Sequence, residues 1–230
     1  GAGSVTRLGP LLRNMNLRRP LVVADAFMAS PASGAVDKVV SAMSGAVQQY
    51  DVFTDTITDP TTESVTRCVD ALASGNYDSV VALGGGSPID TAKAAAMLHT
   101  HGGQMRDYKA PMVNDTPSLP IIAIPTTAGT GSEATKFTVI TDSDTDEKML
   151  CIGLAYLPIA AILDYELTLT KPFRLTADTG IDAMCHAMEA YVSSKNNVFA
   201  DGWALSAMGR IGQSLHTACH SPSDPHARES

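Results

Sequence analysis

Asp182 and His186 are the side chains of this sequence whose types and spacing best suit metal binding. They stand four residues apart in the segment TGIDAMCHAMEAY. On a helix this spacing puts both side chains on one face, about 6 Å apart along the axis. A carboxylate oxygen and an imidazole nitrogen together suit Fe²⁺, Zn²⁺ or Mn²⁺. The pair therefore predicts half of a metal site, with further ligands supplied from elsewhere.

The residues around this pair are apolar, and a helix that is apolar on most sides is expected to be buried. A buried polar group needs a partner, because burial without a hydrogen bond is costly. The spacing therefore leaves a second possibility open, in which the two side chains form a structural ion pair only with each other. The apolar neighbours are Ile181, Ala183, Met184, Ala187 and Met188.

Three consecutive glycines follow an apolar run that predicts a strand. Gly84, Gly85 and Gly86 come directly after SVVAL, residues 79–83. Glycines let main-chain N–H groups approach a phosphate closely, and the helix that follows points its positive end at the same place. Open α/β sheets bind ligands at the carboxyl ends of their strands. The motif therefore predicts an anion cradle, and the alternative is a tight turn that needs a positive φ.

The residues after the glycines carry the signals of a helix start. We predict Ser87 as the N-cap, Pro88 as the first helical residue and Asp90 as the acid of a capping box. A second loop, IPTTAGTGSEAT at residues 124–135, offers hydroxyl groups that can donate to sugar or phosphate oxygens. These hydroxyl groups belong to Thr126, Thr127, Thr130 and Ser132.

Asp25 ends the apolar run PLVVAD, which predicts another strand. An acid at the end of such a strand can accept two hydrogen bonds from a ribose diol, and it repels a 2′-phosphate. Asp25 therefore favours NAD over NADP. The alternative is a loop or N-cap aspartate with no ligand.

Short apolar runs alternate with helical patterns over most of the chain, which predicts a parallel sheet with helices on its faces. Thr61 or Thr62 is expected to cap a helix that stops at Gly75. The segment SDTD predicts a hairpin turn between two later strands. The expected strands are 20–25, 51–55, 79–84, 119–125, 136–142, 147–153 and 160–165, with helices within 34–50 and 61–75.

After about residue 166 the sequence has helical patterns with no strand between them. We therefore predict two domains. An α/β dinucleotide-binding domain with a parallel sheet spans residues 1–167, and the start of an all-helical, metal-binding domain spans residues 168–230.

Composition excludes some classes of function. The formal net charge of -8 offers no basic stripe for nucleic acid. The four cysteines form no C-x-x-C pair, which fits a reducing cytoplasm. The N-terminal residues lack the features of a signal peptide, and the apolar runs are too short to span a membrane.

These motifs together resemble the iron-containing (group III) alcohol dehydrogenase family. The resemblance runs from Gly1 to about Glu229 and rests on GGGSPIDTAKA, IPTTAGTGSEAT, LPIAAILDYELTLT and TADTGIDAMCHAMEAYVS. It implies an N-terminal α/β domain that binds NAD(P), an all-helical domain, and an active site in the cleft between them. It also implies a bound metal, usually iron and sometimes zinc, and a homodimer or larger homo-oligomer.

The resemblance assigns roles position by position. Asp182 and His186 match the first two metal ligands, and Asp25 matches the acid associated with NAD preference. Gly84, Gly85, Gly86, Ser87 and Asp90 match the pyrophosphate loop, while Thr126, Thr127, Thr130, Phe137 and Lys148 match positions that line the nucleotide.

Two departures from the family pattern affect the expected site. Asp59 stands where family members usually have asparagine, so it either weakens cofactor binding or turns away from it. The family's third and fourth metal ligands are histidines at positions that would follow Ser230. We therefore expect the chain to be a piece of a longer protein.

The resemblance implies an NAD-linked, metal-dependent alcohol dehydrogenase that interconverts a small alcohol and its aldehyde or ketone. An enzyme like glycerol dehydrogenase, or a hydroxyacid–oxoacid transhydrogenase, is an alternative within the same fold. A third possibility is a module that binds NAD without catalysing a reaction.

Overall fold

Apolar strands separated by helices form a parallel sheet, as the alternation of patterns predicts. The computed structural model describes residues 1–195 and 197–230. Its main sheet has the strand order β2-β1-β3-β4-β7, and all neighbouring strands run parallel. The strands are β1 (Pro20–Val23), β2 (Asp51–Phe53), β3 (Ser79–Gly84), β4 (Ile121–Pro125) and β7 (Ala160–Ala161).

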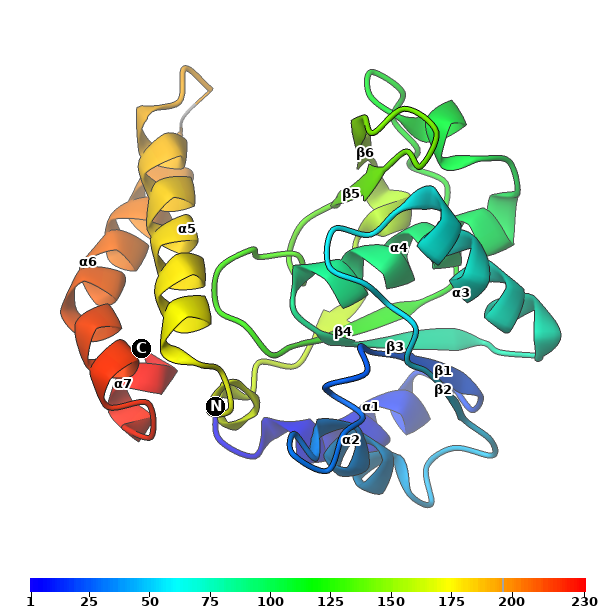
Figure 1. The fold of residues 1–230 in the computed structure, drawn as a ribbon, viewed down its shortest axis with the longest axis horizontal. Helices are drawn as coiled ribbons and strands as arrows, with labels where there is room; N and C mark the ends of the chain where they lie inside the picture. The colour runs from blue at the N-terminus through cyan, green and yellow to red at the C-terminus, as the bar shows by residue number, and fades with distance from the viewer. Residues whose placement is uncertain (196) are drawn as a thin grey trace. The chain divides into compact units, whose positions relative to one another are not determined.

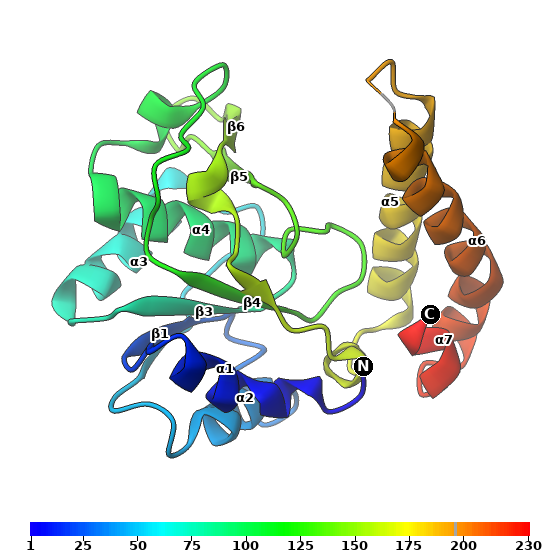
Figure 2. The same cartoon turned by 180° about the vertical axis from the view of Figure 1, so that it is seen from behind.

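Helices cover both faces of this sheet, so its central strands are buried throughout (Figures 1 and 2). On one face lie α3 (Thr62–Ser74) and α4 (Gly86–His101), and on the other lie α1 (Leu8–Asn14) and α2 (Ala35–Met43). Alternate strand residues such as Leu21, Val80 and Ile121 join the core beneath α3 and α4. The predicted α/β class with a parallel sheet is confirmed.

Helix boundaries follow capping chemistry where a cap is present. The Thr61 side chain accepts a hydrogen bond from the backbone N–H of Ser64, and the Ser64 hydroxyl accepts one from the N–H of Thr61, so α3 begins with a capping box. The helix ends at Gly75, as predicted. The helical pattern over 34–50 extends too far, because α2 ends at Met43 and Gly45 has a left-handed φ of 69°.

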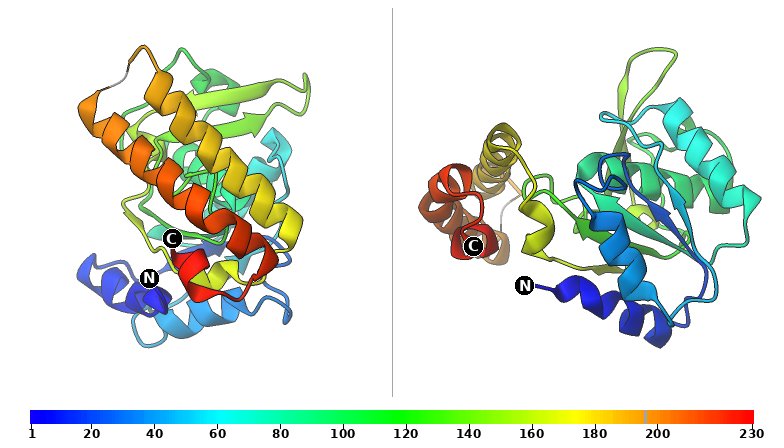
Figure 3. Two further views of the ribbon diagram at one scale, coloured as in Figure 1. Left: turned by 90° about the vertical axis from the view of Figure 1, so that its left-hand side faces the viewer. Right: turned by 60° about the horizontal axis from the view of Figure 1, so that its bottom comes forward.

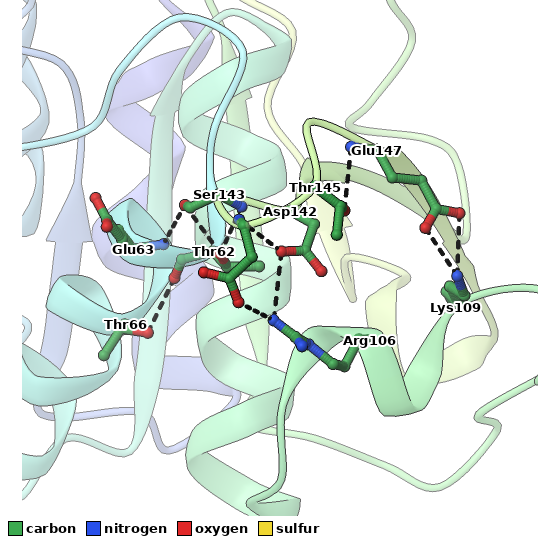
Figure 4. Close-up of polar contacts among 10 residues, drawn as sticks. Thr62, Glu63, Thr66, Arg106, Lys109, Asp142, Ser143, Thr145 and Glu147 are labelled. Carbon is green, nitrogen blue, oxygen red and sulfur yellow. Dashed lines mark hydrogen bonds and ion pairs between the residues drawn. The ribbon is translucent and has the colours of Figure 1, made fainter.

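A separate antiparallel hairpin, β5 (Phe137–Thr141) and β6 (Lys148–Ile152), confirms the turn predicted at SDTD. Its turn is fixed at two points, shown in Figure 4. The Thr62 hydroxyl, at the start of α3, donates to Ser143 Oγ and accepts from the Ser143 N–H. Arg106, in the short helix η2 (Met105–Tyr108), forms ion pairs with Asp142 and Asp144.

The chain divides into two compact units. The sheet and the hairpin belong to one unit, which comprises Gly3–Pro125 and Ser132–Asp164. The short helices η1 (Ser4–Arg7) and η3 (Leu154–Tyr156) complete this unit. The predicted strand 160–165 is too long: β7 ends at Ala161, and Asp164 instead accepts hydrogen bonds from the N–H groups of Gly3 and Val5.

The other unit contains only helices and loops among its described residues, and the short helix η4 (Tyr165–Thr168) begins its longest segment. Its helices α5 (Phe173–Val192) and α6 (Val198–His220) run side by side, and α7 (Pro225–Glu229) follows them (Figure 3). Gly180 on α5 allows close packing, because a Cβ there would lie 2.3 Å from a methyl carbon of Leu215 on α6. Within the described part of the chain, every helix is too short or too polar to span a bilayer.

Replacing Thr61 by alanine is expected to destabilise the α/β unit by about 1 kcal/mol, because the first turn of α3 loses a side-chain acceptor. Urea unfolding followed by circular dichroism measures this loss. Thr66→Ala is the matched control, since the exposed Thr66 hydroxyl bonds only within the helix, to the Thr62 carbonyl. Equal midpoints for Thr61→Ala and the wild-type chain would refute the capping contribution.

Candidate nucleotide-binding and metal-binding residues

The strand order changes direction at β1, and this change locates the candidate nucleotide site. β1 pairs with β2 on one side and with β3 on the other. In open α/β sheets, ligands bind outside the carboxyl ends of the strands at such a switch point. Asp25 follows β1, and the three glycines begin at the last residue of β3, so the fold brings these two predicted features to the same edge of the sheet.

Of the three glycines, only Gly84 has a backbone conformation that requires a glycine. Its φ is +149°, and a Cβ there would lie 2.6 Å from a ring carbon of Pro88. Gly85 has a φ of -77°, which any residue adopts, and Gly86 has no positive φ. The alternative of a tight turn therefore accounts for Gly84 but leaves the other two glycines without a conformational reason.

The helix that begins at the glycines starts two residues earlier than predicted. α4 starts at Gly86 with Gly85 as its N-cap, so the prediction of Ser87 as N-cap and Pro88 as first helical residue is wrong. Among the described residues, no side chain caps this end of α4. Its first N–H groups therefore keep the positive end of the helix dipole open at the carboxyl edge of the sheet.

Asp90 does not form the predicted capping box. Its carboxylate instead accepts hydrogen bonds from the Ser132 hydroxyl and from the Val139 N–H. Burial raises the pKa of Asp90, while these two hydrogen bonds and the charge of Lys93 lower it. Asp90 thus connects α4 to the segment that leads into β5.

Lys93 is an important residue that the sequence reasoning missed. Its side chain is fully buried, and its ammonium donates to the carbonyl oxygens of Thr135 and Phe137, at 2.9 and 2.8 Å. Burial lowers the pKa of Lys93 to about 8, although the charges of Asp90 and Glu133 oppose this shift. The spacing offered a signal, because Lys93 stands three residues after Asp90 on the same side of the helix.

The hairpin that α4 holds presents one exposed face and one buried face. Phe137 and Lys148, which the family resemblance places along the nucleotide, are both exposed and lie on the same face. Val139 and Leu150 lie between them on that face, directly opposite each other. The structure thus places these two predicted residues on the same face, at opposite ends of the hairpin.

Asp59 turns toward Lys148. Its carboxylate oxygen Oδ1 lies 3.1 Å from Lys148 Nζ, and both side chains are mostly exposed. Asp59 occupies the left-handed region, with a φ of 51°. Asp25 makes a local contact, because its Oδ1 accepts a hydrogen bond from the Met28 N–H at 2.8 Å.

Thr126 directly follows β4, and its fully buried hydroxyl has no hydrogen-bond partner among the described residues. A buried hydroxyl is costly unless a water or a ligand pairs with it. Thr127 and Thr130 follow in the loop and are more exposed. Gly129, between them, permits close packing on α5, since a Cβ there would lie 2.5 Å from the Thr179 carbonyl oxygen.

Asp182 and His186 lie one turn apart on α5, as predicted, but they are not buried. Asp182 Oδ1 lies 3.5 Å from His186 Nε2, and their side chains are 45% and 53% exposed. The prediction of a buried helix is wrong: of the apolar neighbours only Ala187 is buried, and Ile181 and Met188 are each more than half exposed. An exposed pair at this spacing contributes little stability, and the observed contact is the one that the ion-pair alternative describes.

The donor set fits a divalent metal only in part. Asp182 and His186 offer one oxygen and one nitrogen at facing positions. The described residues contain no group of three or more histidine, cysteine, aspartate or glutamate side chains that could hold a metal ion. The two residues are therefore suited to be part of a ligand set, not the whole of one.

Comparisons with known proteins agree with this assignment of fold. Residues 1–165 match the family model described as iron-containing alcohol dehydrogenase, and residues 176–230 match that of its C-terminal domain. The NAD-dependent methanol dehydrogenase of Bacillus methanolicus is 38% identical over 229 residues, which cover all of this chain and 60% of that protein.

Two solved structures show the same architecture. 1,3-propanediol oxidoreductase superposes with a TM-score of 0.95 at 32% identity, covering all of this chain and 59% of that one. Sulfoacetaldehyde reductase from Bifidobacterium kashiwanohense, solved in complex with NAD⁺, gives 0.92 at 33% identity, covering all of this chain and 60% of that one. The chain thus spans about 60% of the length of these relatives.

The stability of the α/β unit is expected to rise with pH above about 8 because of Lys93. Up to that pH both the folded and the unfolded chain hold the proton, and from there to 10.5 the unfolded chain binds more protons than the folded one. Relative to Lys93→Met, the wild-type free energy of unfolding should increase by up to about 3 kcal/mol between pH 7 and 10.5. Urea unfolding of both proteins across this pH range tests the prediction. If the unfolding free energies of the two proteins change with pH in the same way, Lys93 is not a buried cation with a lowered pKa.

Proposed function

We propose that this chain, which belongs to the iron-containing alcohol dehydrogenase family, is part of an enzyme that interconverts a small alcohol and its aldehyde or ketone with NAD. The observation that carries the proposal is the open N-terminus of α4, where Gly85 and Gly86 are glycines that the backbone conformation does not require. Such an end binds the phosphates of a dinucleotide.

Backbone and side-chain groups that follow β1, β3 and β4 would hold the dinucleotide. The N–H groups of Gly86 and Ser87 would donate to the pyrophosphate, and the missing Cβ of Gly85 would let it approach. Asp25 would accept from the ribose diol and repel a 2′-phosphate, which favours NAD over NADP. The unpaired Thr126 hydroxyl would donate to a cofactor oxygen. NAD would supply the hydride acceptor for alcohol oxidation.

Residues of the helical unit would hold the metal. Asp182 and His186 would contribute two of its ligands, and their exposure leaves both side chains open to an ion. A metal ion there, Fe²⁺ or alternatively Zn²⁺, would act as a Lewis acid that lowers the pKa of the alcohol. The NAD-dependent relative and the NAD⁺ complex support this choice of cofactor, and the family description supports iron.

The location and assembly of the protein are also proposals. Four free cysteines, three of them buried, support a reducing compartment such as the cytoplasm. A homodimer or larger homo-oligomer stays a prediction that light scattering after gel filtration would test.

Replacing Gly85 by alanine is expected to weaken NAD⁺ binding at least about tenfold without unfolding the chain. The backbone at Gly85 accepts any residue, but a Cβ there would lie where the pyrophosphate approaches. Calorimetric titration with NAD⁺ measures the affinity. Gly84→Ala is the contrasting variant, since its φ and its contact with Pro88 predict a loss of about 1–3 kcal/mol in unfolding free energy. Unchanged NAD⁺ affinity in the Gly85 variant would argue against the cradle.

Asp182→Ala and His186→Ala in the complete gene product are expected to lose both bound metal and alcohol oxidation, because each variant removes one ligand. Metal analysis and the rate of NADH formation with short alcohols measure these losses. His216→Ala is the control, since this histidine of α6 is stacked on His220. Full metal content and activity in the first two variants would refute the metal assignment, whereas NAD⁺ binding without metal or turnover in the wild type would indicate a nucleotide-binding module.

A further inference from the structure

The loop that joins β2 to α3, residues 54–61, is fixed against the hairpin. The Thr141 N–H donates to the Pro60 carbonyl oxygen at 2.8 Å, and Thr61 forms a parallel bridge with Thr141. This loop begins at the carboxyl end of β2, which lies beside β1 in the sheet. Asp59 is therefore held at the same edge as the candidate nucleotide site, facing the first residue of β6.

Carboxylates of this loop are paired with two cations. Asp55 forms an ion pair with Arg67 of α3, and Asp59 forms one with Lys148 of β6. The second pair has a distance of 3.1 Å, with side-chain exposures of 64% for Lys148 and 72% for Asp59. Lys148 is thus paired with a carboxylate on the exposed face of the hairpin.

An exposed ion pair of this kind is weak and easily exchanged. Water screens both charges, and the long lysine side chain loses conformational freedom when it is held in one position. The ammonium has three donors on a flexible stem, so an anionic or hydroxyl-rich ligand can take it over from Asp59. The carboxylate of Asp59 also repels phosphate groups that approach this edge.

We propose that Asp59 lowers the affinity for the dinucleotide by holding Lys148 in this ion pair, so that the cofactor competes with Asp59 for the ammonium. The inference rests on the proposed function. Asp59 acts through Lys148 and is therefore a positioning residue that sets how tightly the cofactor is held.

Calorimetric titration of the full chain with NAD⁺ tests this inference. Asp59→Asn keeps the size of the side chain and removes its charge, and it should tighten binding about two- to five-fold, as expected for release of an exposed ion pair. Glu147→Gln is the matched control. It removes one carboxylate from an exposed ion pair of the same hairpin, with Lys109, but leaves Lys148 paired. It should leave the affinity unchanged.

A double-mutant cycle separates action through Lys148 from general repulsion. Lys148→Met should weaken NAD⁺ binding in both backgrounds, and by a factor about two- to five-fold larger when Asp59 is already asparagine. The advantage of Asp59→Asn should also shrink at about 0.5 M salt, since the charges are exposed.

The outcomes are distinct. If the wild-type chain binds NAD⁺ and Asp59→Asn binds it equally or more weakly, the inference is overturned while the proposed function stands. The inference is also overturned if Glu147→Gln tightens NAD⁺ binding as much as Asp59→Asn does. It is overturned as well if the effects of Asp59→Asn and Lys148→Met on NAD⁺ affinity are additive. A wild-type chain that binds no NAD⁺ would overturn the proposed function and this inference together.

Discussion

The buried ammonium of Lys93 constrains the arrangement of the candidate nucleotide site. A cation without solvent is tolerated only when its donors are satisfied, and those of Lys93 are directed at the backbone of Thr135 and Phe137. Together with Asp90, which binds Ser132 and Val139, it ties residues 132–139 to α4. These bonds join the helix that starts at the glycine turn to the strand that carries Phe137. This ties the candidate pyrophosphate contacts to the hairpin face that also carries Lys148.

Positive and negative charges lie together at the carboxyl edge of the sheet. The open end of α4 contributes the positive end of a helix dipole, while the 54–61 loop contributes carboxylates that pair with Arg67 and Lys148. The groups that attract an anion are thus backbone N–H groups, whose positions are fixed. The carboxylates that oppose this attraction belong to side chains that are free to rearrange. Such a site favours a ligand with its phosphates at one defined point.

The helical unit differs from the α/β unit in how much apolar surface it covers. The strands β1, β3 and β4 are buried, but α5 and α6 expose large apolar side chains such as Ile181, Met188 and Trp203. The same exposure applies to Asp182 and His186, so both remain reachable by an ion. Their suitability as ligands therefore rests on donor chemistry and spacing and not on a buried environment.

The sequence by itself determined the elements and the candidate chemistry, because both depend on local patterns. Apolar runs predicted β1, β3 and β4, and Thr61 predicted the start of α3. The three glycines and the Asp182–His186 spacing predicted a phosphate site and a metal site, and these stay predictions. The tertiary structure alone decided which of these side chains form hydrogen bonds or ion pairs with distant parts of the chain. Asp90 and Lys93 bind residues at least 42 positions away, and Asp59 pairs with Lys148 across 89 positions. No local pattern encodes such pairings, since they arise from the order in which strands assemble and from the need to satisfy polar groups that this assembly buries.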